Sequence, residues 1–159
     1  QLNDLKNIKL MELNNNLKIN LSNKISISPF LVPHRNEFSE TVGYNININN
    51  KSIIYVPDID SWKSLDFSIH DIIKKCDYAF IDGTFYDQNE LGRDMKKIPH
   101  PTIKDSINLF DNLPEKDKEK IHFIHFNHTN PVISNEKFGR QNVLDKGFNL
   151  AYEGQIIRC

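Results

Sequence analysis

The hydrophobic pattern changes its period partway along the chain, and this change limits the folds that are open to it. Apolar and polar side chains alternate from residue 17 to residue 50, which predicts antiparallel strands. The pair Asn49-Asn50 is typical of a hairpin turn. Residues 1–16 are polar with scattered apolar residues and predict a lead-in strand or loop. The expected strands lie at 18–21, 24–32, 42–49 and 51–57.

After this run the pattern predicts helices that alternate with strands. Apolar residues from Trp62 to Ile73 recur at helical spacing and predict one helix over 61–74. The letters T-I-K-D, which begin at Thr102, form a capping-box pattern that predicts the start of another helix. We therefore expect one α/β domain over 1–159, a mixed sheet with helices on one side. The other expected elements are strands at 78–81, 121–126 and within 148–158, and a helix at 136–146.

The composition is that of an ordinary soluble globular protein. Hydrophobic residues make up 38% and charged residues 26%, and the net charge is −1. This balance argues against a nucleic-acid or membrane partner, and no stretch has the length of a membrane span. The two cysteines, Cys76 and Cys159, are too few for a disulfide framework and fit a reducing, cytoplasmic setting. We expect Cys76 to be a small buried thiol.

Polar side chains that can bind metal follow four of the expected strands. His34 follows the run PFLVP, Asp58 follows IIYVP, Asp82 follows YAFI, and His125 ends FIHF. Strand ends at one edge of a sheet are where α/β proteins assemble their sites. Nitrogen and oxygen donors of this kind suit zinc, manganese or iron.

Each of these residues also has an ordinary structural explanation. A single histidine is more often a surface or core residue than a ligand, and we expect His70 to be such a surface residue. His122 and His125 are an odd number of residues apart, so on one strand they point to opposite faces. Asp82 would serve equally well as the cap of the turn after its strand. Glu40 could orient His34, or it could be an exposed acid without a role.

Four segments make the chain resemble the C-terminal half of a metallo-β-lactamase-fold hydrolase. The branch that it resembles includes pyrroloquinoline quinone biosynthesis protein B, with ribonuclease Z and phosphodiesterases as more distant relatives. The DGT sequence after one strand and the H-x-N-x-T-N-P strand end are the most specific signals. The segments are LVPHRNEFSETVGY (31–44), YVPDID (55–60), DYAFIDGTFYDQNEL (77–91) and FIHFNHTNP (123–131).

The resemblance implies an αββα sandwich and a role for each site residue. His34 would be the third-motif metal ligand, Asp58 the aspartate that bridges two metals, and His125 the final-motif ligand. His100 resembles a histidine that opens a helix in those relatives and acts as a general acid. The earlier HxHxDH motif is absent from these 159 residues, so the chain would supply the later half of a site. The missing N-terminal half of the same fold would then be its partner.

These expectations define one leading function and two alternatives. The leading function is a metal-dependent hydrolase that uses a metal-bound water or hydroxide, with His100 and Asp58 as catalytic residues and a small-molecule substrate. It would hold one or two divalent ions, zinc first, with iron or manganese as alternatives. The alternatives are a phosphodiesterase or ribonuclease Z-like hydrolase and a non-catalytic fragment. We expect the chain alone to be inactive, and a homo-oligomer is left open. Four residues are expected to contact substrate or support the ligands: Asp82, Thr84, His128 and Glu40.

Overall fold

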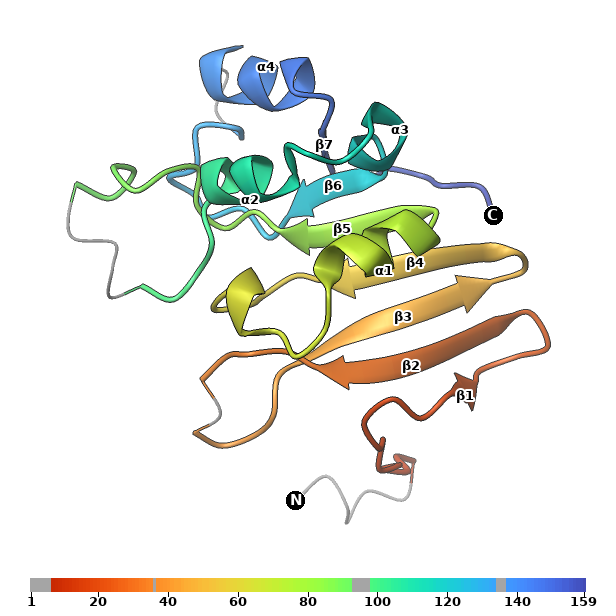
Figure 1. The fold of residues 1–159 in the computed structure, drawn as a ribbon. Helices are drawn as coiled ribbons and strands as arrows, with labels where there is room; N and C mark the ends of the chain where they lie inside the picture. The colour runs from red at the N-terminus through yellow and green to blue at the C-terminus, as the bar shows by residue number, and fades with distance from the viewer. Residues whose placement is uncertain (1–6, 36, 93–97, 134–136) are drawn as a thin grey trace.

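A single sheet of seven strands organises the molecule (Figure 1). In the computed structural model, residues 7–35, 37–92, 98–133 and 137–159 are described. The strands follow one another across the sheet in sequence order, antiparallel from β1 to β4 and parallel from β4 to β7, which confirms the mixed sheet. They are β1 (Ile19–Asn20), β2 (Ile25–Leu31), β3 (Val42–Ile48), β4 (Lys51–Val56), β5 (Tyr78–Asp82), β6 (Ile121–Ile124) and β7 (Asn149–Leu150).

The predicted strands are correct in position, but the first and the last two are clearly shorter than predicted. The β3–β4 turn lies at Asn49-Asn50, where Asn49 has a φ of 53°, a left-handed conformation that asparagine tolerates. Strand β6 ends before His125, whose φ is 64°. Beyond Leu150 the chain forms no further strand. The expected lead-in over 1–16 has no strand in residues 7–16, and residues 1–6 lie outside the described part.

The prediction of one helix over 61–74 is wrong, because two serines start two separate elements. The Ser61 side chain accepts a hydrogen bond from the backbone N–H of Lys63, and Ser68 accepts one from that of Asp71. Between them Leu65 is extended, with φ −67° and ψ 141°. The apolar spacing persists because both pieces bury their apolar side chains. The two elements are η2 (Trp62–Ser64), a 3₁₀ helix, and α1 (Ile69–Lys75).

The capping box at Thr102 forms as predicted and fixes the start of the helix α2. The Thr102 side chain accepts from the backbone of Asp105, and the Asp105 side chain accepts from the backbone of Thr102. The indole N–H of Trp62 donates to Ser106 Oγ over 2.9 Å and ties η2 to α2. The helix α4 lies where one was predicted, although residue 136 is outside the described part. These helices are α2 (Ile103–Phe110), α3 (Glu115–Lys118) and α4 (Lys137–Asp145).

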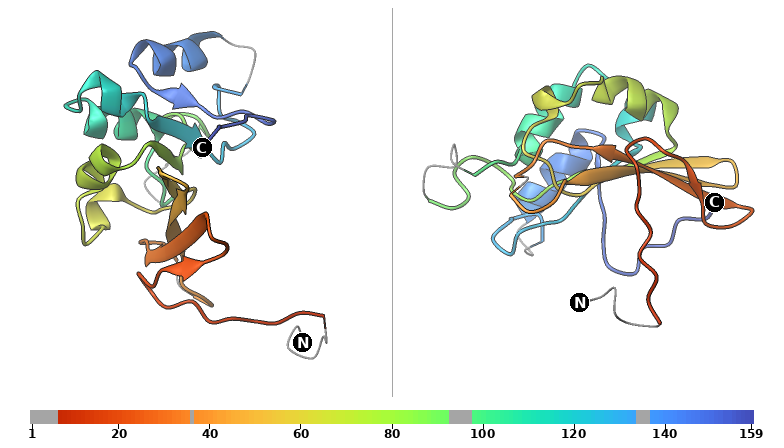
Figure 2. Two further views of the ribbon diagram at one scale, coloured as in Figure 1. Left: turned by 90° about the vertical axis from the view of Figure 1, so that its right-hand side faces the viewer. Right: turned by 90° about the horizontal axis from the view of Figure 1, so that it is seen from below.

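The helices η2, α1, α2 and α3 gather on one face of the sheet, and α4 lies near the β7 end (Figure 2). The helix-covered face carries the core, including Ile54, Ala79, Ile81 and Phe123, which are all buried. Cys76 is buried as predicted, and burial raises the pKa of its thiol to about 11. No helix of the described residues is long and apolar enough to cross a membrane.

Candidate metal centre

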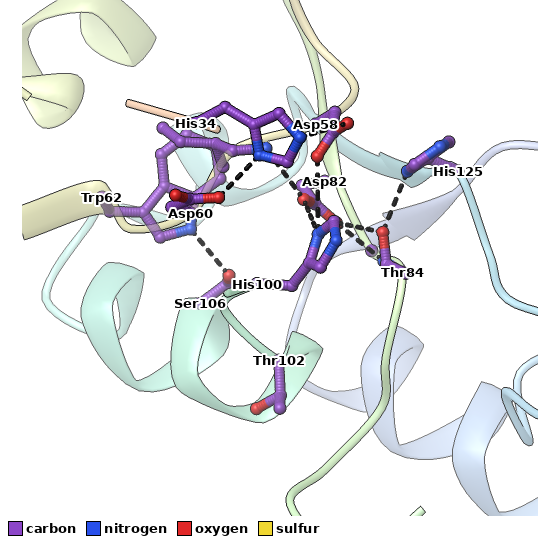
Figure 3. A network of polar contacts seen from close by, with 12 residues as sticks. His34, Asp58, Asp60, Trp62, Asp82, Thr84, His100, Thr102, Ser106 and His125 are labelled. Carbon is purple, nitrogen blue, oxygen red and sulfur yellow. Dashed lines mark hydrogen bonds and ion pairs between the residues drawn. The ribbon is translucent and has the colours of Figure 1, made fainter. Parts of the chain in front are cut away.

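The loops that follow β2, β4, β5 and β6 meet at one edge of the sheet and bring the site together. These four strands run in the same direction, so the segments that follow them leave the sheet at the same edge. Figure 3 shows the side chains of His34, Asp58, Asp82, His100 and His125 gathered there. His34, Asp58, Asp82 and His125 therefore lie at one edge of the sheet, and His100 joins them from the segment before α2.

His34 lies between two aspartates of the loop after β4. Its Nδ1 atom is 2.6 Å from Asp60 Oδ1, and its Nε2 atom is 3.4 Å from Asp58 Oδ2. The backbone N–H of Asp60 donates to the carbonyl of Pro33 over 2.8 Å, which fixes this loop against the loop that carries His34. Asp60 thus makes the contact with His34 that was one of the two alternatives for Glu40. Glu40 itself is exposed, and no contact joins it to His34 among the described residues.

Asp82 is the most deeply buried charged group of the site, with 0% of its side chain exposed. Its Oδ1 atom accepts from the backbone N–H and the hydroxyl of Thr84, over 2.8 and 2.7 Å. Its Oδ2 atom accepts from the backbone N–H of Ile59 at 3.1 Å and from His100 Nδ1 at 2.9 Å. Asp82 thus caps the turn after β5, which was its ordinary structural explanation. It also orients the ring of His100.

His100 lies close to Asp58 and Asp82, with Nδ1 3.6 Å from Asp58 Oδ1. Burial of the ring disfavours its charged form, but the hydrogen bond to Asp82 and the charges of Asp82, Asp58 and Asp60 outweigh this. The result is a pKa above the ordinary value for histidine. The ring of Phe85 packs edge-on against it, with ring centroids 5.7 Å apart.

His125 reaches the site through an unusual backbone conformation. A φ of 64° is uncommon for a residue other than glycine and is often found at functional sites. Its Nδ1 atom is 2.9 Å from Thr84 Oγ1, and its ring centroid is 6.4 Å from that of His100. His122 remains on the strand, buried and stacked on Phe80, and burial lowers the pKa of its imidazole.

Two further histidines, His70 and His128, lie outside this cluster. His70 was predicted to be a surface residue, and this is wrong, because its Nε2–H donates to the carbonyl of Leu109 over 3.0 Å and its ring packs on Phe110. The His70–Leu109 hydrogen bond links α1 to the neighbouring helix α2. His128 is exposed, and none of the described hydrogen bonds connects it to the site.

The side chains present fit a divalent cation. Asp58, Asp82 and His100 each offer a ligand atom, and these atoms lie within 4.8 Å of one another. Asp82 already accepts four hydrogen bonds, which suits a supporting role better than coordination. Asp58 Oδ1 is buried and has no hydrogen-bond partner in the described residues, and a bound cation would satisfy it. The ligand set His34, Asp58 and His125 stays a prediction.

The fold and this cluster of histidines and aspartates define the class of protein. The chain belongs to the family described as the beta-lactamase superfamily domain, which matches residues 2–126. Within that family it is similar to coenzyme PQQ synthesis protein B. The protein of that name from Pseudomonas fluorescens (strain SBW25) is 25% identical over 147 residues, which cover 83% of this chain and 46% of the relative. The one from Nitrosococcus oceani is 26% identical over 145 residues, which cover 83% and 45%.

A solved structure shows the same fold. The crystal structure of Zn(2+)-bound PqqB from Methylobacterium extorquens superposes with a TM-score of 0.75 at 20% identity. The match covers 92% of this chain and 55% of that one. The family resemblance and the α/β fold expected from the sequence are thereby confirmed. The chain spans about half the length of the curated relatives that it matches.

Proposed function

We propose that this chain forms the C-terminal half of a metal-dependent hydrolase similar to coenzyme PQQ synthesis protein B. The observation that carries the proposal is the buried, unpartnered Oδ1 atom of Asp58, which lies near the imidazole rings of His34 and His100. The zinc of the related Methylobacterium extorquens structure supports zinc as the first choice of ion. A bound divalent ion would supply Lewis-acid chemistry, which lowers the pKa of water.

The residues of this chain would bind that ion, orient the site histidines and donate a proton. Asp58, His34 and His125 would hold it through carboxylate oxygen and imidazole nitrogen. Asp82 orients His100 through its 2.9 Å hydrogen bond. The hydrogen bond to Asp82 raises the pKa of His100 in the metal-free protein and so favours the protonated imidazole, the form that can donate a proton to a leaving group.

Replacing His100 by Ala is expected to leave the metal content of the intact protein unchanged and to lower metal-stimulated turnover about 100-fold or more, because general acid catalysis contributes on that scale. Elemental analysis gives the metal content, and hydrolysis of a panel of generic ester, amide and phosphodiester substrates gives the turnover. Asp66→Ala is the control, since Asp66 is exposed and has no role in the predicted site. An intact protein that binds no metal would refute the proposed function. One that binds metal and hydrolyses nothing would favour the non-catalytic alternative.

The face of the sheet opposite the helices supports a partner of the same fold. Ile27, Ile46 and Ile53 are aligned across β2, β3 and β4 on this face, and Tyr44 pairs with Tyr55 beside them. Leu31 and Tyr55 are 48% and 38% exposed. Ile53 is buried and Ile27, Ile46 and Tyr44 are half-buried, so Leu31 and Tyr55 carry the exposed apolar surface of this face. Exposed apolar side chains that lie next to one another on a sheet are typical of an interface.

We propose that the N-terminal half of the same fold covers this face and completes the site. The chain spans about half the length of its relatives, and the other half of such a relative is of a size that would supply the cover. His122, on the same face, has a buried Nδ1 atom that finds no partner in the described part of the chain. A second sheet packed on this face would bury the exposed side chains and could supply a partner for His122.

Replacing Tyr55 by Lys is expected to destabilise the intact protein by roughly 2 kcal/mol or more, because a charge would replace an aromatic ring that the proposed second sheet buries. Urea unfolding measures the change. Phe138→Lys is the control, since Phe138 is 76% exposed on α4. Equal, small effects of the two substitutions would show that the face is not covered.

A further inference from the structure

The three site histidines all use the same ring nitrogen to contact a supporting group. His34 contacts Asp60, His100 contacts Asp82, and His125 contacts Thr84, in each case through Nδ1. A neutral imidazole has one N–H and one lone pair, and only the lone pair can bind a cation. The group that contacts Nδ1 therefore decides whether Nε2 is free to bind.

We infer that Asp60 is a positioning residue that holds His34 as the Nδ1–H tautomer and so presents its Nε2 lone pair to the cation site. A carboxylate can only accept a hydrogen bond, so the 2.6 Å contact places the proton on Nδ1. Nε2 then faces Asp58 Oδ2 across 3.4 Å. A cation bound between these two atoms would be coordinated by both the Nε2 lone pair and the carboxylate oxygen.

The backbone gives Asp60 a fixed position from which to act. Its N–H is bonded to the carbonyl of Pro33, one residue before His34. The preceding residue, Ile59, is fully buried, and its N–H donates to Asp82. Asp60 and His34 expose 28% and 20% of their side chains, so the hydrogen bond between them is partly shielded from water.

Thr84 supports the same interpretation at a second histidine. Its hydroxyl has one proton, and the 2.7 Å contact with the carboxylate of Asp82 uses that proton. The oxygen is then left to accept from His125 Nδ1–H at 2.9 Å, which frees Nε2 of His125 as well. Two different supporting groups thus select the same tautomer.

The test compares Asp60→Ala and Asp60→Asn with the control Asp66→Ala in the intact protein. Asp66 is an exposed aspartate between η2 and α1, and its replacement by Ala removes the same charge as Asp60→Ala does. Nitrogen-15 NMR of histidine-labelled, metal-free protein reports the tautomer of His34, and competition with a chelator reports zinc affinity. In Asp60→Ala we expect His34 to move toward the Nε2–H tautomer and zinc affinity to fall about 10- to 100-fold.

Asp60→Asn keeps an oxygen acceptor for Nδ1–H, so it is expected to keep the wild-type tautomer and most of the zinc affinity. Asp66→Ala should match the wild type in both measurements. The inference is overturned if His34 keeps the Nδ1–H tautomer in Asp60→Ala, or if Asp60→Ala binds zinc as tightly as Asp66→Ala. The zinc measurement rests on the proposed metal centre. The tautomer measurement uses neither metal nor turnover, so it stands even if the proposed hydrolase function fails.

Discussion

Replacing Asp82 by Ala is expected to destabilise the metal-free intact protein by roughly 3–5 kcal/mol, as is usual when one partner of a buried polar pair is removed. The substitution leaves two backbone N–H groups, from Ile59 and Thr84, without their acceptor. It also removes the acceptor of the Thr84 hydroxyl and of His100 Nδ1–H. Each buried donor left unsatisfied costs about 1–3 kcal/mol, although such costs do not simply add.

Urea unfolding of the metal-free protein measures this change without any contribution from ion binding. Asp66→Ala is again the control and should shift stability by no more than about 0.5 kcal/mol, as surface substitutions do. A destabilisation by Asp82→Ala of less than about 1 kcal/mol would show that Asp82 does not organise the site as the structure indicates.

The position of the site could be predicted because it depends on strand direction and spacing alone. Alternating and apolar runs located β2, β4, β5 and β6, and their common direction brings the residues after them to one edge. The capping box located the start of α2, and with it His100 two residues before Thr102. The hydrophobic pattern and the capping residues were sufficient to predict these features.

The contacts within the site could not be predicted, because they depend on how loops cross. Glu40 is the acid closer to His34 in the sequence, yet Asp60, 26 residues away, makes the contact, because the loop after β4 is held against Pro33 by a backbone hydrogen bond. The left-handed backbone of His125 also has no local signal, because most histidines have a negative φ and the residue type alone does not mark the exception. For η2 and α1, the capping serines were visible in the sequence, but the apolar spacing fitted one helix equally well.

Replacing Asp58 by Ala is expected to have the opposite pattern of effects from replacing Asp82. Asp58 has 31% of its side chain exposed, and its Oδ1 atom makes no hydrogen bond to the described residues. Its loss should therefore change the stability of the metal-free protein by less than about 1 kcal/mol. Zinc affinity should fall by more than about 100-fold, beyond the loss typical of a supporting residue, because a ligand itself is removed.

Chelator competition and elemental analysis of the intact protein measure the loss of zinc, and urea unfolding in the presence of chelator measures the stability. Asp58→Asn is the close comparison: it keeps the size of the side chain but loses the negative charge, so it should also bind zinc weakly. Asp60→Ala, for which we expect zinc affinity to fall about 10- to 100-fold, shows the size of the effect for a residue that acts through a ligand. If Asp58→Ala keeps more zinc affinity than Asp60→Ala, the cation is held by other groups. The cluster of Asp82 and His100 would then be the next set to test.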